Sequence, residues 1–156
     1  MSAVSPINWE VKSFEGLTNK ELYSVLKLRS EVFVVEQNCP YPDMDGKDIY
    51  SFHLMGTNEK NKLIAYARLL PADIAFKEVS IGRVATAQAA RRTGAGIELM
   101  QNALQIIEDK HGKVPIRIGA QLYLKKFYER FGFVQDSEMY LEDGIEHIEM
   151  LKTPVN

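Results

Sequence analysis

One segment of this sequence constrains the fold more than any other, because a strand pattern passes there through a glycine-containing loop into a helix pattern. Residues 78–86 alternate as a strand does, with small or partly polar side chains on one side and, on the other, Val79, Ile81, Arg83 and Ala85. A loop rich in Ala, Arg and Gly covers residues 88–96, and an apolar stripe at helical spacing follows, namely Ile97, Met100, Leu104 and Ile107. Such a unit predicts an α/β fold in which helices cover a sheet.

The segment before this unit predicts a strand and a long helix. An apolar pattern that starts at Trp9 indicates the strand. Thr18 and Glu21 have the spacing of a capping box, in which the Thr side chain accepts from a free helix amide and the Glu reaches back. We therefore expect a helix of roughly four turns to begin there. It should end before the polar loop 37–47, which contains proline and glycine.

The other elements follow from apolar spacing between turn residues. Strands are expected at residues 52–54, 63–70, 115–119, 133–134 and 147–151, the first two forming a hairpin and the last two joined around residues 142–144. The helix that starts near Ile97 should end at Gly112, and a shorter helix should cover 122–130. Strands interleaved with helices predict a mixed α/β (α+β) sheet with helices on both faces.

Length, charge and cysteine content exclude several classes of protein. The chain has 156 residues, which predicts a single domain over 1–156. Its 19 basic and 21 acidic residues give a net charge of −2, which argues against nucleic acid as a partner. Cys39 is the only cysteine and the three histidines have no zinc-binding spacing, so we expect neither a disulfide nor a bound metal.

The sequence has no pattern for membrane insertion or export. No run approaches 18 uncharged apolar residues, and residues 1–10 lack a basic start followed by an apolar stretch. We therefore expect a cytoplasmic protein without a membrane partner.

The loop at residues 88–96 has the features of a phosphate site. Free amides at a helix amino terminus point toward whatever lies there, and the helix dipole adds partial positive charge. Gly94 and Gly96 allow close approach to the backbone, and Arg91 and Arg92 supply positive charge. A tight turn alone is the other explanation for the glycines. A dinucleotide fingerprint is excluded, since Leu99 stands where its third glycine belongs.

The string Arg91-x-x-Gly94-x-Gly96 resembles motif A of the GNAT superfamily of N-acetyltransferases, whose loop amides cradle the pyrophosphate of acetyl-CoA. The stretch 124–133, with Tyr128 on a short helix before a Gly-Phe, resembles motif B of that superfamily. The stretches 31–46 and 143–150 are similar to the small ElaA-like branch. The resemblance covers nearly the whole chain, and the joint match is specific where each motif alone is not.

This resemblance implies how acetyl-CoA would be held. The fourth and fifth strands would splay apart, and the pantetheine arm would lie in the split and pair with the backbone of the fourth strand. Gln121 stands where many GNAT enzymes have an Asn, and Lys125 and Lys126 are candidates for the nucleotide 3′-phosphate. The expected cofactor-binding residues are Val84, Ala85, Thr86, Arg91, Arg92, Thr93, Gly94, Ala95, Gly96, Ile97, Gln121 and Tyr128.

For catalysis, the resemblance identifies Tyr128 as the acid that protonates the leaving sulfur or orients it. An amine acceptor is mostly protonated at neutral pH, so a base or a water chain must take its proton. Spacing does not distinguish between three candidate bases, which are Glu36, His147 and Glu78. Each is also explained as a salt-bridge partner or an ordinary strand residue.

The expected function is transfer of an acetyl group from acetyl-CoA to a primary amine of a small molecule or peptide, in a ternary complex. A non-catalytic acyl-CoA-binding or sensing module is the alternative, and a homodimer is possible. Three acids in one loop, Asp43, Asp45 and Asp48, do not meet the Ca²⁺-loop pattern, but near an acceptor mouth they would favour a cationic amine. The loops 35–48 and 135–147 are expected to select the acceptor.

Overall fold

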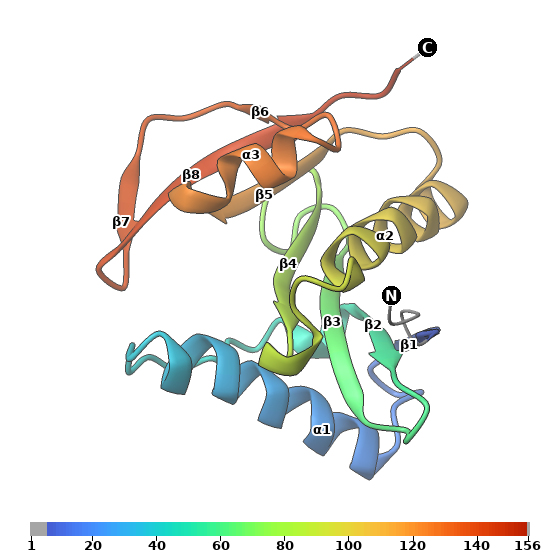
Figure 1. The fold of residues 1–156 in the computed structure, drawn as a ribbon. Coiled ribbons are helices and arrows are strands. Elements are labelled where there is room, and N and C mark those ends of the chain that lie inside the picture. Colours follow the sequence, from blue (N-terminus) through green and yellow to red (C-terminus); the bar gives the residue numbers. More distant parts are fainter. Residues whose placement is uncertain (1–5, 156) are drawn as a thin grey trace.

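The computed structural model describes residues 6–155 and shows a mixed sheet that carries helices on both faces (Figure 1). Its strands are β1 Asn8–Ser13, β2 Phe52–Thr57, β3 Leu63–Leu70, β4 Val79–Thr86, β5 Ile116–Gln121, β6 Val134–Gln135, β7 Tyr140–Glu142 and β8 Ile145–Lys152. The α-helices are α1 Asn19–Arg29, α2 Ala95–His111 and α3 Lys125–Glu129. Residues 1–5, which belong to the segment expected to lack an export signal, lie outside the described range, as does residue 156 of the expected domain.

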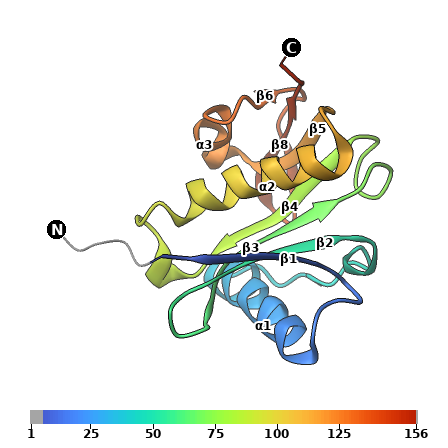
Figure 2. The ribbon, with the colours of Figure 1, turned by 90° about the vertical axis from the view of Figure 1, so that its right-hand side faces the viewer.

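The sheet has the order β1-β2-β3-β4-β5-β8-β6, with β7 also paired to β8. Every pair is antiparallel except β4 and β5, which are parallel. Helices α1 and α2 pack on opposite faces of β3 and β4, as Figure 2 shows. The mixed sheet with helices on both faces that the sequence predicted is therefore confirmed.

Two clusters of buried side chains hold these helices. On the α2 face, Leu99, Met100 and Ala103 pack against apolar residues of the central strands. On the α1 face, Val25 and Leu28 pack against Tyr66 and other strand residues. Burial of apolar area on both faces stabilises the central strands and fixes the two helices beside the same part of the sheet.

Helix α1 begins as its sequence predicts and ends in a wider turn. The Thr18 hydroxyl accepts a hydrogen bond from the Glu21 amide at 3.1 Å, and the Thr18 amide donates to the Glu21 carboxylate at 2.8 Å, so the capping box is confirmed. The helix continues as a π-helix, η1 (Ser30–Glu36), up to the expected end. The apolar pattern does not distinguish this π-helix from an α-helix. The π-helix brings Phe33 to the wall of a cavity.

A β-bulge in β4 changes the alternation that the sequence predicted. The register between β3 and β4 shifts between Tyr66 and Arg68, and Arg83 has a positive φ of 51°. As a result, Val84 joins Val79 and Ile81 on the α2 face, while Ala85 packs into the cluster under α1. The expectation that Val79, Ile81, Arg83 and Ala85 share one side is wrong beyond Ile81, because an extra residue in one strand reverses the faces.

The carboxy-terminal strands differ from expectation in number. Strand β8 pairs with β6 at one end and with β7 at the other, and β7 and β8 form a hairpin around residues 142–145. The expected closing strands are present, but β7 was not predicted because three residues give too short a pattern. In Figure 1 the turn between β7 and β8 lies at the left, away from α2. None of the helices over residues 6–155 is long and apolar enough to cross a membrane.

Candidate active site

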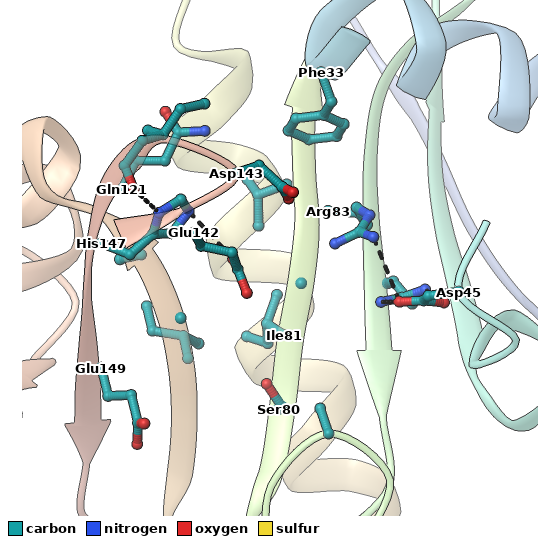
Figure 3. Close-up of a pocket in the computed structure, with 18 of the residues that line it drawn as sticks. Phe33, Asp45, Ser80, Ile81, Arg83, Gln121, Glu142, Asp143, His147 and Glu149 are labelled. Atoms are coloured by element: carbon teal, nitrogen blue, oxygen red, sulfur yellow. Dashed lines mark hydrogen bonds and ion pairs between the residues drawn. The ribbon is translucent and has the colours of Figure 1, made fainter. Parts of the chain in front are cut away.

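Strands β4 and β5 separate soon after they begin. They pair only at Val79 with Ile116 and at Ser80 with Arg117. Beyond these pairs, residues 81–86 of β4 and 118–121 of β5 face one another without a ladder between them. Backbone donors and acceptors on such edges need a partner if water is displaced. A cavity of about 690 Å³ lies in this split, lined by both strands (Figure 3).

The amino terminus of α2 lies where β4 and its loop end. Gly94 caps the helix with a φ of 87°, in the left-handed region that glycine adopts without strain. The first helical hydrogen bond runs from the Glu98 amide to the Gly94 carbonyl at 3.1 Å, so the amides of residues 95–97 are free of the helix ladder. A Cβ on Gly94 would meet no protein atom within 4 Å. The first turn of α2 is therefore open for an anion.

The arginine of this loop is held by a glutamate. Arg91 donates to both carboxylate oxygens of Glu36, at 2.5 and 2.8 Å, and to the Thr86 carbonyl at 3.1 Å. The Glu36 carboxylate raises the pKa of Arg91 further. Thr93 donates to the Ala90 carbonyl at 2.5 Å, which shapes the turn. Glu36, expected at the acceptor cleft, thus lies beside the loop that precedes α2 and is not among the residues that line the cavity.

Four residues expected in the site line the cavity, namely Val84, Gln121, Tyr128 and His147. Glu78 does not. It pairs with Arg117 at 3.1 Å, and this arginine lowers the pKa of Glu78. Arg117 also pairs with Asp136 and Glu149, so Glu78 belongs to a charge cluster at the unsplit end of the sheet.

The Tyr128 hydroxyl has an environment that keeps its proton. The ring packs edge-on against Phe127 and Phe133, with centroids 5.2 and 6.1 Å away. Burial raises the pKa of Tyr128, because the phenolate would be poorly solvated there. Within residues 6–155, this hydroxyl makes no hydrogen bond, although the residue lines the cavity. It is a protonated donor available to a bound molecule.

His147 lies across the split from β4 and has a defined tautomer. Its Nδ1 is 2.7 Å from the Ile145 carbonyl, which can only accept, so Nδ1 carries the proton. Its Nε2 lies 3.5 Å from the Glu142 carboxylate. Tyr140 stacks on the imidazole ring with centroids 5.8 Å apart. The backbone thus holds Nδ1, and Nε2 is the ring nitrogen on the side of Glu142.

The three acids of the loop after η1 are neutralised by arginines. Asp43 binds Arg29 and Arg83, each at 2.8 Å, and Asp48 binds Arg29 and Arg68 at 2.7 and 2.9 Å. Asp45 pairs with Arg68 at 2.8 Å and with Arg83 at 3.4 Å. The three arginines balance the three aspartates, so this loop alone gives the site no preference for a cationic acceptor. The expectation that the acids would favour a cationic amine is therefore corrected.

Sequence reasoning missed these arginines, although a signal was present. Arg68 and Arg83 stand inside largely apolar strands, and Arg29 lies in a helix that packs on the sheet. Arg29 and Arg68 are 0% and 3% exposed. A buried arginine requires a partner, and the acidic loop supplied the matching number of carboxylates. Over residues 6–155 no group of His, Cys, Asp and Glu side chains is arranged to hold a metal ion.

Known structures share this fold. An acyl-CoA N-acyltransferase from Pseudomonas aeruginosa matches with a TM-score of 0.90 at 45% identity, covering 95% of this chain and 100% of that one. Escherichia coli ElaA matches with a TM-score of 0.88 at 40% identity, covering 94% and 99%. A GNAT family acetyltransferase from Elizabethkingia anophelis with acetyl-CoA bound shares the fold at 17% identity, with a TM-score of 0.67 and coverage of 94% and 97%. The fold and the cavity define an acyltransferase.

The sequence comparison identifies the family. Residues 22–154 match the acetyltransferase (GNAT) domain. Protein ElaA of Escherichia coli K12 is 41% identical over 148 residues, which are 94% of this chain and 96% of that protein. The chain therefore belongs to the GNAT acetyltransferase family and is ElaA-like over most of its length. The resemblance seen in the sequence motifs is confirmed.

Proposed function

We propose that this acetyltransferase moves the acetyl group of acetyl-CoA to a primary amine, with both substrates bound together in the split between β4 and β5. The observation that carries the proposal is the pair of open strand edges, residues 81–86 and 118–121, that face one cavity. The amide groups of a pantetheine arm can pair with such edges as an added strand does. The acetyl-CoA in the Elizabethkingia structure supports this reading.

The residues around the split fit the parts of acetyl-CoA. The backbone of Val84 and Thr86 would pair with the pantetheine arm, beside Ala85 and Gln121. The free amides at residues 95–97 and the open space over Gly94 suit the pyrophosphate. The charge nearby would come from Arg91 and Arg92, with Thr93 fixing the loop, and from Lys125 and Lys126 for the 3′-phosphate.

In this proposal, two residues that line the cavity, His147 and Tyr128, act as base and acid. Acetyl-CoA supplies an acyl carbon activated as a thioester. His147 Nε2 takes a proton from the acceptor ammonium, and the freed amine nitrogen bonds to the acyl carbon. As the carbon–sulfur bond breaks, the Tyr128 hydroxyl gives its proton to the sulfur. After the attack, the nitrogen loses one more proton to water, which leaves the neutral amide. His147 and Tyr128 then recover their starting protonation by exchange with solvent.

We assign the role of base to His147 in place of Glu36 and Glu78. Glu36 is bound through both oxygens by Arg91, and Glu78 is bound by Arg117. Neither lines the cavity. Glu36 would instead position Arg91, which reaches the β4 backbone at Thr86.

Ligand-dependent unfolding tests the cofactor site. Acetyl-CoA and CoA at about 100 times Kd should each add about 2.7 kcal/mol to stability, whereas NADP and ATP should not. No selective rise in Tm would contradict acetyl-CoA binding.

Catalytic variants test the two assigned roles. In assays of thiol release, His147→Gln should lower kcat/KM about 100-fold and move the pH profile to higher pH, where the amine is already neutral. Tyr128→Phe should lower kcat about tenfold, because a thiolate leaves with modest help from an acid. His111→Gln, at an exposed residue at the end of α2, is the matched control. An unchanged profile in His147→Gln would exclude it as the base.

A further inference from the structure

The part of the cavity on the acceptor side, which we name the acceptor chamber, has walls of opposite charge. It is bounded on one side by Arg83, with Lys47 in the loop after η1, and on the other side by Glu142, Asp143 and His147. Figure 3 shows Arg83 across the cavity from Glu142 and Asp143. The walls come from segments far apart in the chain, namely the loop after η1 with the bulge of β4, and the β7–β8 hairpin.

Arg83 presents a fixed donor to the chamber. Its Nε and Nη2 donate to Asp43 at 2.8 and 3.0 Å, and its guanidinium lies 5.7 Å from the ring centroid of Tyr41. Within residues 6–155, its Nη1 makes no hydrogen bond, so two N–H groups stay available. In Figure 3 a guanidinium nitrogen points away from Asp45, toward the side on which Glu142 and Asp143 lie. Arg83 therefore offers one nitrogen to an anionic group.

The net charge of this wall comes from Lys47. The arginines and aspartates of the loop balance, and Arg83 is one of them. Lys47 lines the cavity, and over the described range its ammonium has no carboxylate within ion-pair distance. The wall is thus positive by one charge and carries a preorganised hydrogen-bond donor, which together suit a carboxylate.

The opposite wall is acidic. Glu142 approaches only His147, and in the part of the chain that the structure describes neither Glu142 nor Asp143 pairs with a lysine or arginine. Glu149, which also lines the cavity, differs because Arg117 neutralises it at 3.0 Å. The Asp143 carbonyl accepts from the Cys39 thiol at 3.5 Å, which ties the hairpin turn to the loop after η1. The Glu142 carboxylate, 3.5 Å from His147 Nε2, together with Asp143 at the hairpin turn makes this wall suit an ammonium group.

We propose that the acceptor is a small zwitterion, an amine that carries a carboxylate on the same molecule, with the carboxylate on Arg83 and Lys47 and the amino group beside Glu142, Asp143 and His147. This inference rests on the proposed acetyl transfer and names its substrate class. A polyamine would meet Lys47 and Arg83 as like charges, and an amine without a carboxylate would leave Nη1 without a partner. Acetylation removes the ammonium charge, so the acidic wall no longer attracts the product, which favours its release.

Matched pairs of acceptors test the inference on the wild-type protein. The panel pairs glycine with glycinamide, β-alanine with β-alaninamide, and 4-aminobutyrate with butylamine, and thiol release is measured at one pH with each amine corrected for its neutral fraction. In at least one pair, the acceptor that carries a carboxylate should have a kcat/KM at least tenfold higher than its neutral partner, chiefly through a lower KM. The spacing of the preferred pair gives the length that the chamber accepts.

Variants connect this preference to the wall. Arg83→Gln should bring the ratio of kcat/KM between the carboxylate acceptor and its neutral partner toward one. Lys47→Gln should lower this ratio several-fold. Arg130→Gln removes the same charge from an exposed residue outside the cavity and should leave the ratio unchanged. Because Arg83 helps to hold Asp43, Lys47→Gln keeps the test available if Arg83→Gln is poorly folded.

The outcomes separate this inference from the proposed function. Equal or better turnover of the amides and of butylamine would overturn the zwitterion while leaving acetyl transfer in place. No turnover of any carboxylate would overturn it as well, and stabilisation by acetyl-CoA would then show that the cofactor site is intact. If acetyl-CoA does not bind, the proposed function itself fails.

Discussion

The proposed phosphate site at the start of α2, which we name the phosphate end, and the acceptor chamber are built from different groups of the protein. The phosphate end uses mainly backbone groups of one continuous segment, residues 94–97, at the start of α2. The acceptor chamber uses side chains from the loop after η1, the bulge of β4 and the β7–β8 hairpin. Backbone sites depend on local conformation, whereas side-chain sites depend on which segments the fold brings together. The two regions should therefore respond differently to substitution.

Asp48→Ala should have the largest effect on stability, and it acts on the charge cluster that borders the acceptor chamber. Asp48 accepts from both Arg29 and Arg68, which are buried, so its loss leaves two guanidinium groups short of a charge partner. We expect a loss of about 3–5 kcal/mol in the free energy of unfolding, measured with urea. Asp136→Ala, which breaks a pair that is 51% exposed at its aspartate, should cost under about 1 kcal/mol. Equal costs would show that the buried cluster has no special weight.

The same cluster should make the protein sensitive to acid. Burial alone would raise the pKa of Asp45 and Asp48, but hydrogen bonds from Arg68 and Arg29 outweigh it, and both pKa values lie below the usual range. A lowered pKa means that the unfolded chain binds protons first, so this stability is present above about pH 4 and is lost as the pH falls further. Urea titrations from pH 6 to pH 3 should show this decline.

A control sharpens the acid test. In Asp48→Asn the decline below about pH 4 should be shallower, because one of the groups that link folding to proton release is gone. A slope identical to the wild type would assign the acid sensitivity to other carboxylates.

Gly94→Val should act on the phosphate end and leave the chamber intact. A β-branched residue at a φ of 87° is strained, and its side chain would occupy the open space over the first turn of α2. We expect acetyl-CoA affinity to fall at least tenfold in calorimetry, with the acceptor preference unchanged. Gly112→Val is the matched control, because Gly112 has a φ of 79° and open space at its Cβ position but lies at the other end of α2. If both variants bind alike, the turn at Gly94 is not the phosphate site.

Glu36→Gln should have the smallest effect. It weakens the pair with Arg91, whose carboxylate partner is 38% exposed, so the change in stability should stay within about 1 kcal/mol. Acetyl-CoA affinity should rise by up to about threefold, because Arg91 is released for a phosphate. Glu31→Gln, which disrupts the exposed pair with Lys27, should not change affinity. A large fall in kcat for Glu36→Gln would return it to the list of candidate bases.

The same contrast explains which parts of the fold were predictable. The capping box at Thr18, the β2–β3 hairpin and the helix from the Gly94 loop to Gly112 were correct because each depends on neighbours in sequence. The bulge at Arg83 was missed, because an extra residue in one strand is defined by the register with its partner strand. The π-helix η1 and the three-residue β7 left no distinct periodicity.

The sequence by itself determined the family, the mixed sheet and the phosphate loop, since these rest on contiguous motifs and on the spacing of apolar residues. Only the tertiary structure decided the electrostatics of the acceptor chamber. Asp43, Asp45 and Asp48 make their loop acidic in the sequence, yet Arg29, Arg68 and Arg83 balance them in the structure. Over residues 6–155, Glu142, which is 3.5 Å from His147, and Asp143 pair with no lysine or arginine. A carboxylate's effect on a ligand depends on the groups within a few ångströms of it, and distance along the chain does not give that distance in space.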